Sequence, residues 1–232
     1  MLDIWTFDLK DISRETERFV RSLLTPDETA RAQHYALPEK GRDFALARGL
    51  VRHVLSGYVP TPAQDLLFTL NSHGKPELAT HNGPALFFNL SHSRSYVCLA
   101  ISPNRRVGVD IEVRDKDIQK LDKIASFAFS DPEVQALSAY PATFRREAFY
   151  TLWTAKEAYV KGTGEGLTRL RNISCRIRCP GHYLIAQGIN GDDNWRLHHF
   201  QPWPHVQGTV AMEGRGSVLI VHRNAQTAWR KM

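Results

Sequence analysis

The spacing of apolar and polar residues changes period several times along the first part of the chain. Alternation with a period of two predicts a strand over residues 2–9. Spacings of three and four then predict helices that follow Ser13, Thr25 and Leu37 in turn. The period returns to two from about residue 66, so this part is expected to run from strand to helices and back to strands.

Local signals mark where two of these helices begin and end. Thr25 precedes Pro26 and is followed three residues later by Glu28, which is the pattern of a capping box. A further helix is expected from about Pro38 to Ser56–Gly57, where a glycine can end it.

The middle of the chain is rich in predicted strands, which lie at 66–70, 86–93, 96–102 and 107–113. Residues 103–106 have the composition of a turn, so we expect the last two strands to pair as a hairpin.

The second part of the chain begins with helical periodicity and ends with alternation. Helices are predicted at 117–125, 130–139 and 142–162, with Gly162 as the stop of the longest. Short alternating runs then predict an antiparallel sheet, at 173–178, 183–186, 195–200, 206–212 and 217–222. The order of elements predicts an α+β fold.

Composition narrows the class of protein. The 232 residues are 42% hydrophobic and 23% charged, as in a globular protein that buries a core. No signal peptide is recognisable, no apolar run approaches the ~20 residues that span a bilayer, and the three cysteines are too few for a disulfide framework. We therefore expect a cytoplasmic protein that does not bind a membrane. The net charge of +6 favours an anionic binding partner.

Two segments carry residues with catalytic chemistry. Asp110 and Glu112 alternate with apolar residues in the 107–113 strand, so both project from the same face. Glu157 and Lys161 are four apart in the 142–162 helix and share a face as well. Together they suit Mg²⁺ and a phosphate ester, because Mg²⁺ prefers one or two carboxylates and leaves positions for phosphate and water.

Simpler interpretations exist for each pair taken alone. The two strand acids are also typical of a solvated edge strand, and the helix pair of a surface ion pair. A Mg²⁺-dependent phosphoesterase or nuclease would use the same residue types. A non-enzymatic nucleic-acid-binding module is less favoured, because no basic stripe is interleaved with aromatic residues.

Several motifs in a fixed order resemble one family, the 4′-phosphopantetheinyl transferases of the longer, pseudo-dimeric type that includes the surfactin-synthetase-activating enzyme. The strongest matches are Gly74-Lys-Pro76, Phe88-Asn-Leu-Ser-His-Ser93, Gly108-Val-Asp-Ile-Glu112 and Trp153-Thr-Ala-Lys-Glu-Ala-Tyr-Val-Lys161. Weaker matches are Leu24-Thr-Pro-Asp-Glu28 and Arg48-Gly-Leu-Val-Arg52. The resemblance extends from about residue 24 to residue 167.

The resemblance implies an activity and an architecture. The phosphopantetheine arm of coenzyme A would be transferred to a serine of an apo acyl or peptidyl carrier protein, with release of adenosine 3′,5′-bisphosphate. It implies a monomer with two similar α+β halves, residues 1–104 and 105–232, and a site in the cleft between them. Carriers of fatty-acid, polyketide and nonribosomal-peptide synthesis all remain open.

The resemblance also implies roles for individual residues. Asp110, Glu112 and Glu157 would bind Mg²⁺, and Glu157 would also be placed to activate the serine. Lys161 would hold a phosphate. Contacts with coenzyme A would come from Arg48, Lys75, Ser91, His92 and Lys156, with Arg48 and His92 at the 3′-phosphate. One departure is Glu28, where members of this type often have a basic residue, so Arg31 is expected to serve instead.

Overall fold

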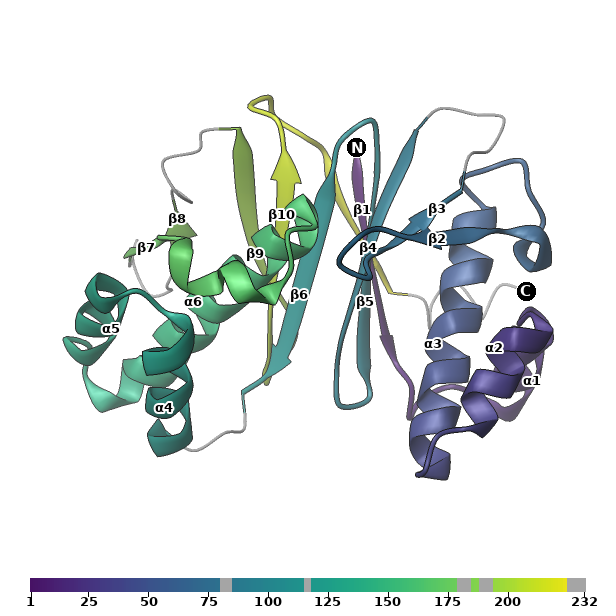
Figure 1. Cartoon of the computed structure of the whole chain (residues 1–232), viewed down its shortest axis with the longest axis horizontal. Coiled ribbons are helices and arrows are strands. Elements are labelled where there is room, and N and C mark those ends of the chain that lie inside the picture. The colour runs from purple at the N-terminus through teal and green to yellow at the C-terminus, as the bar shows by residue number, and fades with distance from the viewer. Residues whose placement is uncertain (80–84, 115–117, 179–184, 188–193, 225–232) are drawn as a thin grey trace.

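The computed structural model describes residues 1–79, 85–114, 118–178, 185–187 and 194–224. Figure 1 shows two groups of elements side by side, each with a central sheet and with helices on its outer side. The predicted α+β class is confirmed. Among the described residues, no helix combines the length and apolar character needed to cross a membrane.

The first group is built on a four-stranded sheet in the order β11-β1-β5-β4. Its strands are β1 (Leu2–Asp8), β4 (Leu86–Ser93), β5 (Tyr96–Pro103) and β11 (Ile220–Asn224), and a small hairpin, β2 (Phe68–Leu70) with β3 (Pro76–Leu78), lies beside them.

The helices of this group are α1 (Arg14–Ser22), α2 (Pro26–Gln33) and α3 (Pro38–Ser56). Thr25 and Glu28 form the predicted capping box at the start of α2. Apolar residues of α3, including Leu46 and Leu50, pack against Phe88 and Leu99 of the sheet and form its core.

The second group is built on an antiparallel sheet in the order β6-β10-β9. Its strands are β6 (Val107–Val113), β9 (Trp195–Trp203) and β10 (Val206–Glu213), with a separate pair, β7 (Arg176–Arg178) and β8 (Ile185–Gln187). Its helices are α4 (Ile118–Ala128), α5 (Asp131–Ser138) and α6 (Ala142–Thr163).

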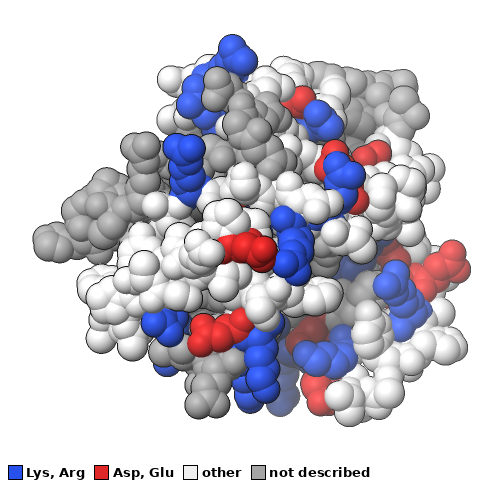
Figure 2. Space-filling view, turned by 60° about the vertical axis from the view of Figure 1, so that its left-hand side comes forward, with Lys and Arg blue, Asp and Glu red and all other residues white. Residues whose placement is uncertain are grey.

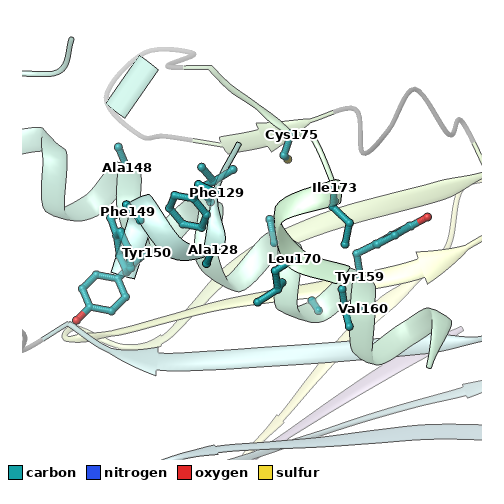
Figure 3. Close-up of a cluster of buried hydrophobic side chains, with 14 of the residues drawn as sticks. Ala128, Phe129, Ala148, Phe149, Tyr150, Tyr159, Val160, Leu170, Ile173 and Cys175 are labelled. Atoms are coloured by element: carbon teal, nitrogen blue, oxygen red, sulfur yellow. The ribbon is translucent and has the colours of Figure 1, made fainter. Parts of the chain in front are cut away.

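The long helix α6 organises the core of the second group. Buried residues from most of its length contact α4, α5 and the 3₁₀ helix Leu167–Asn172. Figure 3 shows Phe129 and Phe149 next to one another in this core, with their ring centroids 5.3 Å apart. The other face of α6 rests on β6 and β10, which fixes its side chains relative to the strand acids.

The two sheets share a third apolar cluster. It joins Leu2, Ile4 and Cys98 of the first sheet to Val109 and Val210 of the second. The halves are therefore held together by a hydrophobic core and act as one folded unit.

Three expectations about the strands were wrong. The strand predicted at 66–70 is shortened to Phe68–Leu70, and its Leu70 is exposed. Strands β5 and β6 do not form a hairpin, because both edges of β5 are already paired, with β1 and with β4. The last strand, β11, lies parallel to β1 in the first sheet and so departs from the predicted antiparallel sheet and from the 105–232 half.

The end of α6 also differs from the prediction. The helix continues through Gly162 and ends at Gly164, which adopts the left-handed conformation with φ of 77°. Gly162 instead allows close packing, because a side chain at this position would collide with Trp195 and crowd Gly108.

Candidate active site

The site forms where β4 of the first sheet lies beside β6 of the second (Figure 1). Side chains at alternate positions of β4 accept hydrogen bonds from alternate backbone N–H groups of β6. The donor–acceptor pairs are Val109 N to Asn89 Oδ1 at 2.8 Å, Ile111 N to Ser91 Oγ at 3.3 Å and Val113 N to Ser93 Oγ at 3.1 Å. This polar seam sets the register between the halves and places the acids of β6 beside the serines of β4.

Asp110 is the most buried acid of the site, with 2% of its surface exposed. Its Oδ1 accepts a hydrogen bond from Ser91 Oγ at 2.9 Å and pairs with the ammonium of Lys161. Its Oδ2 is buried and receives no hydrogen bond from the described residues. A buried carboxylate oxygen without a donor is costly, and binding a cation would remove that cost.

Lys161 links the helix to both strands. Its Nζ lies 3.3 Å from Glu157 Oε2 and donates to Ser91 Oγ at 3.2 Å, in addition to its pair with Asp110. Burial disfavours its charge, but the carboxylates of Asp110 and Glu157 outweigh burial and raise the pKa of Lys161. The residue therefore stays cationic at neutral pH.

In Glu157, the site disfavours the charged form of the side chain. Burial is the largest cause that raises its pKa to about 7, and the charges of Asp110 and Glu112 add to it, while Lys161 lowers it. At neutral pH this carboxyl group is therefore divided between its protonated and ionised forms.

Glu112 lies at the same seam, where Ser93 Oγ donates to Glu112 Oε2 at 2.8 Å. Asp110, Glu112 and Glu157 are thus close enough to influence one another electrostatically. The described residues nevertheless contain no group of three or more His, Cys, Asp or Glu side chains arranged to hold a metal. The Lys161 ammonium instead pairs with two of the three carboxylates.

The donor set still fits Mg²⁺. The carboxylates are hard oxygen ligands. Asp110 Oδ2, which receives no hydrogen bond from the described residues, is the oxygen that a divalent cation would satisfy.

His92 and Lys75 approach this seam from the first half. His92 follows Ser91 on β4, and its side chain reaches the surface. Partial desolvation of the imidazole is the largest cause that lowers its pKa, and the charges of Lys161 and Lys40 lower it further. Lys75 reaches across to the second half, where its Nζ donates to the carbonyl oxygens of Gly162 at 3.1 Å and Val107 at 3.3 Å. Burial lowers the pKa of Lys75 to about 8.

Arg48 and Arg31 lie on the helices of the first half. Arg48 Nε pairs with Glu28 Oε1 at 2.5 Å, and its guanidinium lies 4.1 Å from the centroid of the Phe68 ring. Arg31 is exposed, with its guanidinium 4.9 Å from the centroid of the Phe44 ring. Glu28 thus caps α2 through the backbone N–H of Thr25 and pairs with Arg48. These two interactions explain why an acidic residue occupies position 28.

Lys156 points away from these residues, so the structure does not support the contact with coenzyme A that the sequence predicted for it. Its side chain is fully buried, and its Nζ pairs with Glu133 Oε2 at 2.6 Å. The preceding position on a helix points about 100° away from Glu157. Lys156 therefore faces the α5 side of the core and stabilises the second half.

The sequence did not predict that Asn89 and Ser93 would form hydrogen bonds with the backbone of β6. Both belong to a strand segment whose polar residues alternate, at 89, 91 and 93, within an otherwise apolar run. That alternation was a signal that one face of β4 would be polar, although it did not indicate the partner strand.

Comparison with known proteins assigns the family. The family description "4′-phosphopantetheinyl transferase superfamily" matches residues 106–213, and "4′-phosphopantetheinyl transferase, N-terminal" matches residues 11–104. The 4′-phosphopantetheinyl transferase HetI of Nostoc sp. is 35% identical over 194 residues, which are 83% of this chain and 80% of the relative. The chain belongs to the 4′-phosphopantetheinyl transferase superfamily.

Other relatives of this transferase are similar over comparable lengths. Sfp of Bacillus subtilis is 31% identical, with 74% of each chain covered, and psf-1 of Bacillus pumilus is 30% identical over 79% of this chain and 76% of the relative. A crystal structure of a holo-(acyl-carrier-protein) synthase from Bacillus anthracis in complex with CoA covers 47% of this chain and 96% of its own. The TM-score of this match is 0.36, and the sequence identity is 19%.

Proposed function

We propose that this transferase moves the 4′-phosphopantetheine group of coenzyme A to a serine of an apo acyl or peptidyl carrier protein and releases adenosine 3′,5′-bisphosphate. The observation that carries the proposal is the buried cluster of Asp110, Glu157 and Lys161 at the seam between the halves. Its cation suits a pyrophosphate, and its acids suit Mg²⁺.

The reaction breaks the phosphoanhydride bond in the pyrophosphate of coenzyme A and forms a phosphodiester bond to the serine. The serine oxygen attacks the β-phosphorus of coenzyme A, and the bond from that phosphorus to the bridging oxygen breaks. Adenosine 3′,5′-bisphosphate leaves with the electron pair, and the serine proton passes to a base. Such reactions are accelerated mainly by positioning and by electrostatic stabilisation of the phosphoryl oxygens.

The residues divide this work among them. Glu157 lies beside Lys161 in the carboxylate cluster and, in its ionised form, accepts the serine proton. Lys161 remains protonated and stabilises charge on the phosphates. Asp110 and Glu112, held by Ser91 and Ser93, are the residues that would hold Mg²⁺ together with Glu157. When bound, Mg²⁺ would supply neutralising charge to the pyrophosphate.

Coenzyme A would be gripped from the first half. His92 and Lys75 lie near the seam and would contact its phosphates, with Arg48 and Arg31 contributing from α3 and α2. On this proposal the two halves, 1–104 and 105–232, contribute the nucleotide grip and the catalytic acids respectively. The exception is β11, which completes the first sheet.

Charge supports a protein partner. The net charge of +6 favours an acidic partner such as a carrier protein. Figure 2 shows acidic and basic side chains of the described residues interspersed on the face brought forward there. This distribution favours a carrier protein over nucleic acid. We infer a monomer because one chain provides both sides of the seam, and a cytoplasmic location stays a prediction from the sequence.

The deciding experiment is mass spectrometry of a panel of apo carrier proteins incubated with the enzyme, coenzyme A and Mg²⁺. We expect the mass of phosphopantetheine to be added to at least one carrier. Asp110→Asn, which keeps the size of the side chain, should lower kcat by at least about a hundredfold, because the metal and Lys161 both lose a charge partner.

Two results would contradict the proposal. One is the absence of any mass shift across fatty-acid, polyketide and peptide carriers. The other is release of free phosphopantetheine without a carrier, which would indicate a phosphoesterase.

A further inference from the structure

Two histidines from different sheets face each other away from the polar seam. His198 lies on β9 of the second sheet and His222 on β11 of the first. Their Nε2 atoms are 3.4 Å apart, and their rings are inclined at 46° with centroids 5.6 Å apart. The pair is therefore a contact between the two halves of the molecule.

The separation of the two nitrogens matches shared coordination of a metal ion. Two imidazole nitrogens at ~2.0–2.1 Å from a tetrahedral ion lie about 3.3–3.4 Å from each other. Without a metal, the same contact is a hydrogen bond in which one Nε2–H donates to the other Nε2. The N–N separation equals that of two imidazoles on one tetrahedral ion, and binding would require the hydrogen bond to break and the rings to turn toward the ion.

The surroundings favour the neutral imidazoles that metals bind. Burial lowers the pKa of both rings, and for His198 the charges of His222 and His199 lower it further. Phe200 flanks both rings, with centroid distances of 6.3 Å to His198 and 5.6 Å to His222. His199 belongs to the opposite face of β9 and shares a hydrogen bond with Thr209 Oγ1, so it does not join the pair.

Space for further ligands lies next to the pair. A cavity of about 390 Å³ is lined by His198 together with apolar residues such as Leu2 and Met212. It can admit the waters that would complete a coordination shell. Arg196 and Arg215 also line this cavity, and Arg196 donates to the carbonyl oxygen of Arg215 at 3.2 Å. These cations limit the affinity, so we expect binding in the micromolar range.

We propose that His198 and His222 form a two-histidine site for a borderline divalent transition metal such as Zn²⁺, Ni²⁺ or Cu²⁺. The site differs in chemistry from the carboxylate cluster at Asp110, since imidazole nitrogen suits these metals and hard oxygen suits Mg²⁺. An ion bound there joins β9 to β11 and stabilises the contact between the two sheets.

The test is isothermal titration calorimetry of tag-free protein with Zn²⁺ and Ni²⁺, in a large excess of Mg²⁺ that keeps the carboxylate cluster occupied. We expect one ion per chain and a rise in Tm on binding. Both effects should be lost in His198→Ala and in His222→Ala. His34→Ala is the matched control, because His34 is an exposed histidine at the end of α2 and should leave binding unchanged.

A spectroscopic measurement identifies the ligands directly. Cu²⁺ bound to the wild-type protein should show the electron paramagnetic resonance pattern of two equivalent nitrogens, and His222→Ala should reduce it to one or none. His222 is exposed, so this variant is expected to fold. Binding that survives both histidine substitutions, or the absence of binding below millimolar concentrations, would overturn the proposal.

Discussion

At the scale of single residues, the main feature of the site is that its acidic side chains and the ammonium of Lys161 stabilise one another's charges. Lys161 is held by Asp110 and Glu157, and the same arrangement leaves one oxygen of Asp110 without a donor among the described residues. Three carboxylates near one ammonium leave a net negative charge in a partly desolvated place. Burial, followed by the charge of Asp110, raises the pKa of Glu157 to about 7, and the surplus of carboxylates is what a divalent cation would neutralise.

The titration of Glu157 predicts how pH and Mg²⁺ act together. Its pKa of about 7 in the folded protein exceeds its ordinary value of 4.5, so the folded state binds more protons between these two values. Stability without metal therefore falls as pH rises through this interval, relative to a variant that lacks the group. Mg²⁺ competes with the proton, and the increase in Tm on adding Mg²⁺ should be larger at about pH 8 than at about pH 5.5.

Glu157→Gln is the matched variant for this measurement, because it keeps the shape of the side chain and does not titrate. The variant should show a smaller change in the Mg²⁺ effect between the two pH values, measured by thermal unfolding. An identical pH dependence in both proteins would remove Glu157 from the metal site.

At the scale of elements, the contact between α6 and β6 determines where the catalytic side chains stand. Gly108 of β6 meets the backbone of α6 directly, and a Cβ atom there would overlap the carbonyl oxygen of Ala158 and the backbone nitrogen of Gly162. The absence of a side chain allows the helix carrying Glu157 and Lys161 to lie close to the strand that carries Asp110.

Gly108→Ala should accordingly force helix and strand apart. We expect a loss of about 1–3 kcal/mol or more in the free energy of unfolding, measured by urea denaturation, with a fall in kcat as Lys161 moves away from Asp110. Gly216→Ala is the control, since its nearest neighbour would be a flexible Arg105 side chain at 3.4 Å, and it should change stability by less than about 0.5 kcal/mol. Equal effects of the two substitutions would show that the close approach is unimportant.

At the scale of the whole molecule, the two halves are interlocked by the end of the chain. The family match ends at residue 213, whereas β11 returns to the first sheet and pairs with β1. Asp3 anchors this strand, because its Oδ1 accepts a hydrogen bond from Arg223 Nε at 2.9 Å. Without β11, the edge of β1 would be open to pairing with other chains.

A chain that ends at Glu213 should therefore be less stable and more prone to aggregate than one that ends at Asn224. For a protein of this size, a loss of about 3 kcal/mol lowers Tm by roughly 6–12 °C. Thermal unfolding and light scattering of the two truncations give the comparison. Indistinguishable curves would mean that β11 contributes little to the fold.

The sequence by itself determined the features that depend on near neighbours. Interactions within a few residues of the chain account for several correct predictions. These are the cap at Thr25, the extent of α3, the strands β4 and β6, and the shared face of Glu157 and Lys161. Its motifs also identified the family, since the spacing of catalytic residues within one strand or one helix is local information.

Only the tertiary structure decided which elements meet. In the folded molecule β6 lies beside β4 and not beside β5, and β11 pairs with β1. Lys156 lies in the core, whereas Lys161 lies in the site. Periodicity shows that a strand or helix has two faces, but the partner of each face depends on packing between residues far apart in the chain. For that reason the polar seam and the two-histidine contact emerged only from the folded molecule.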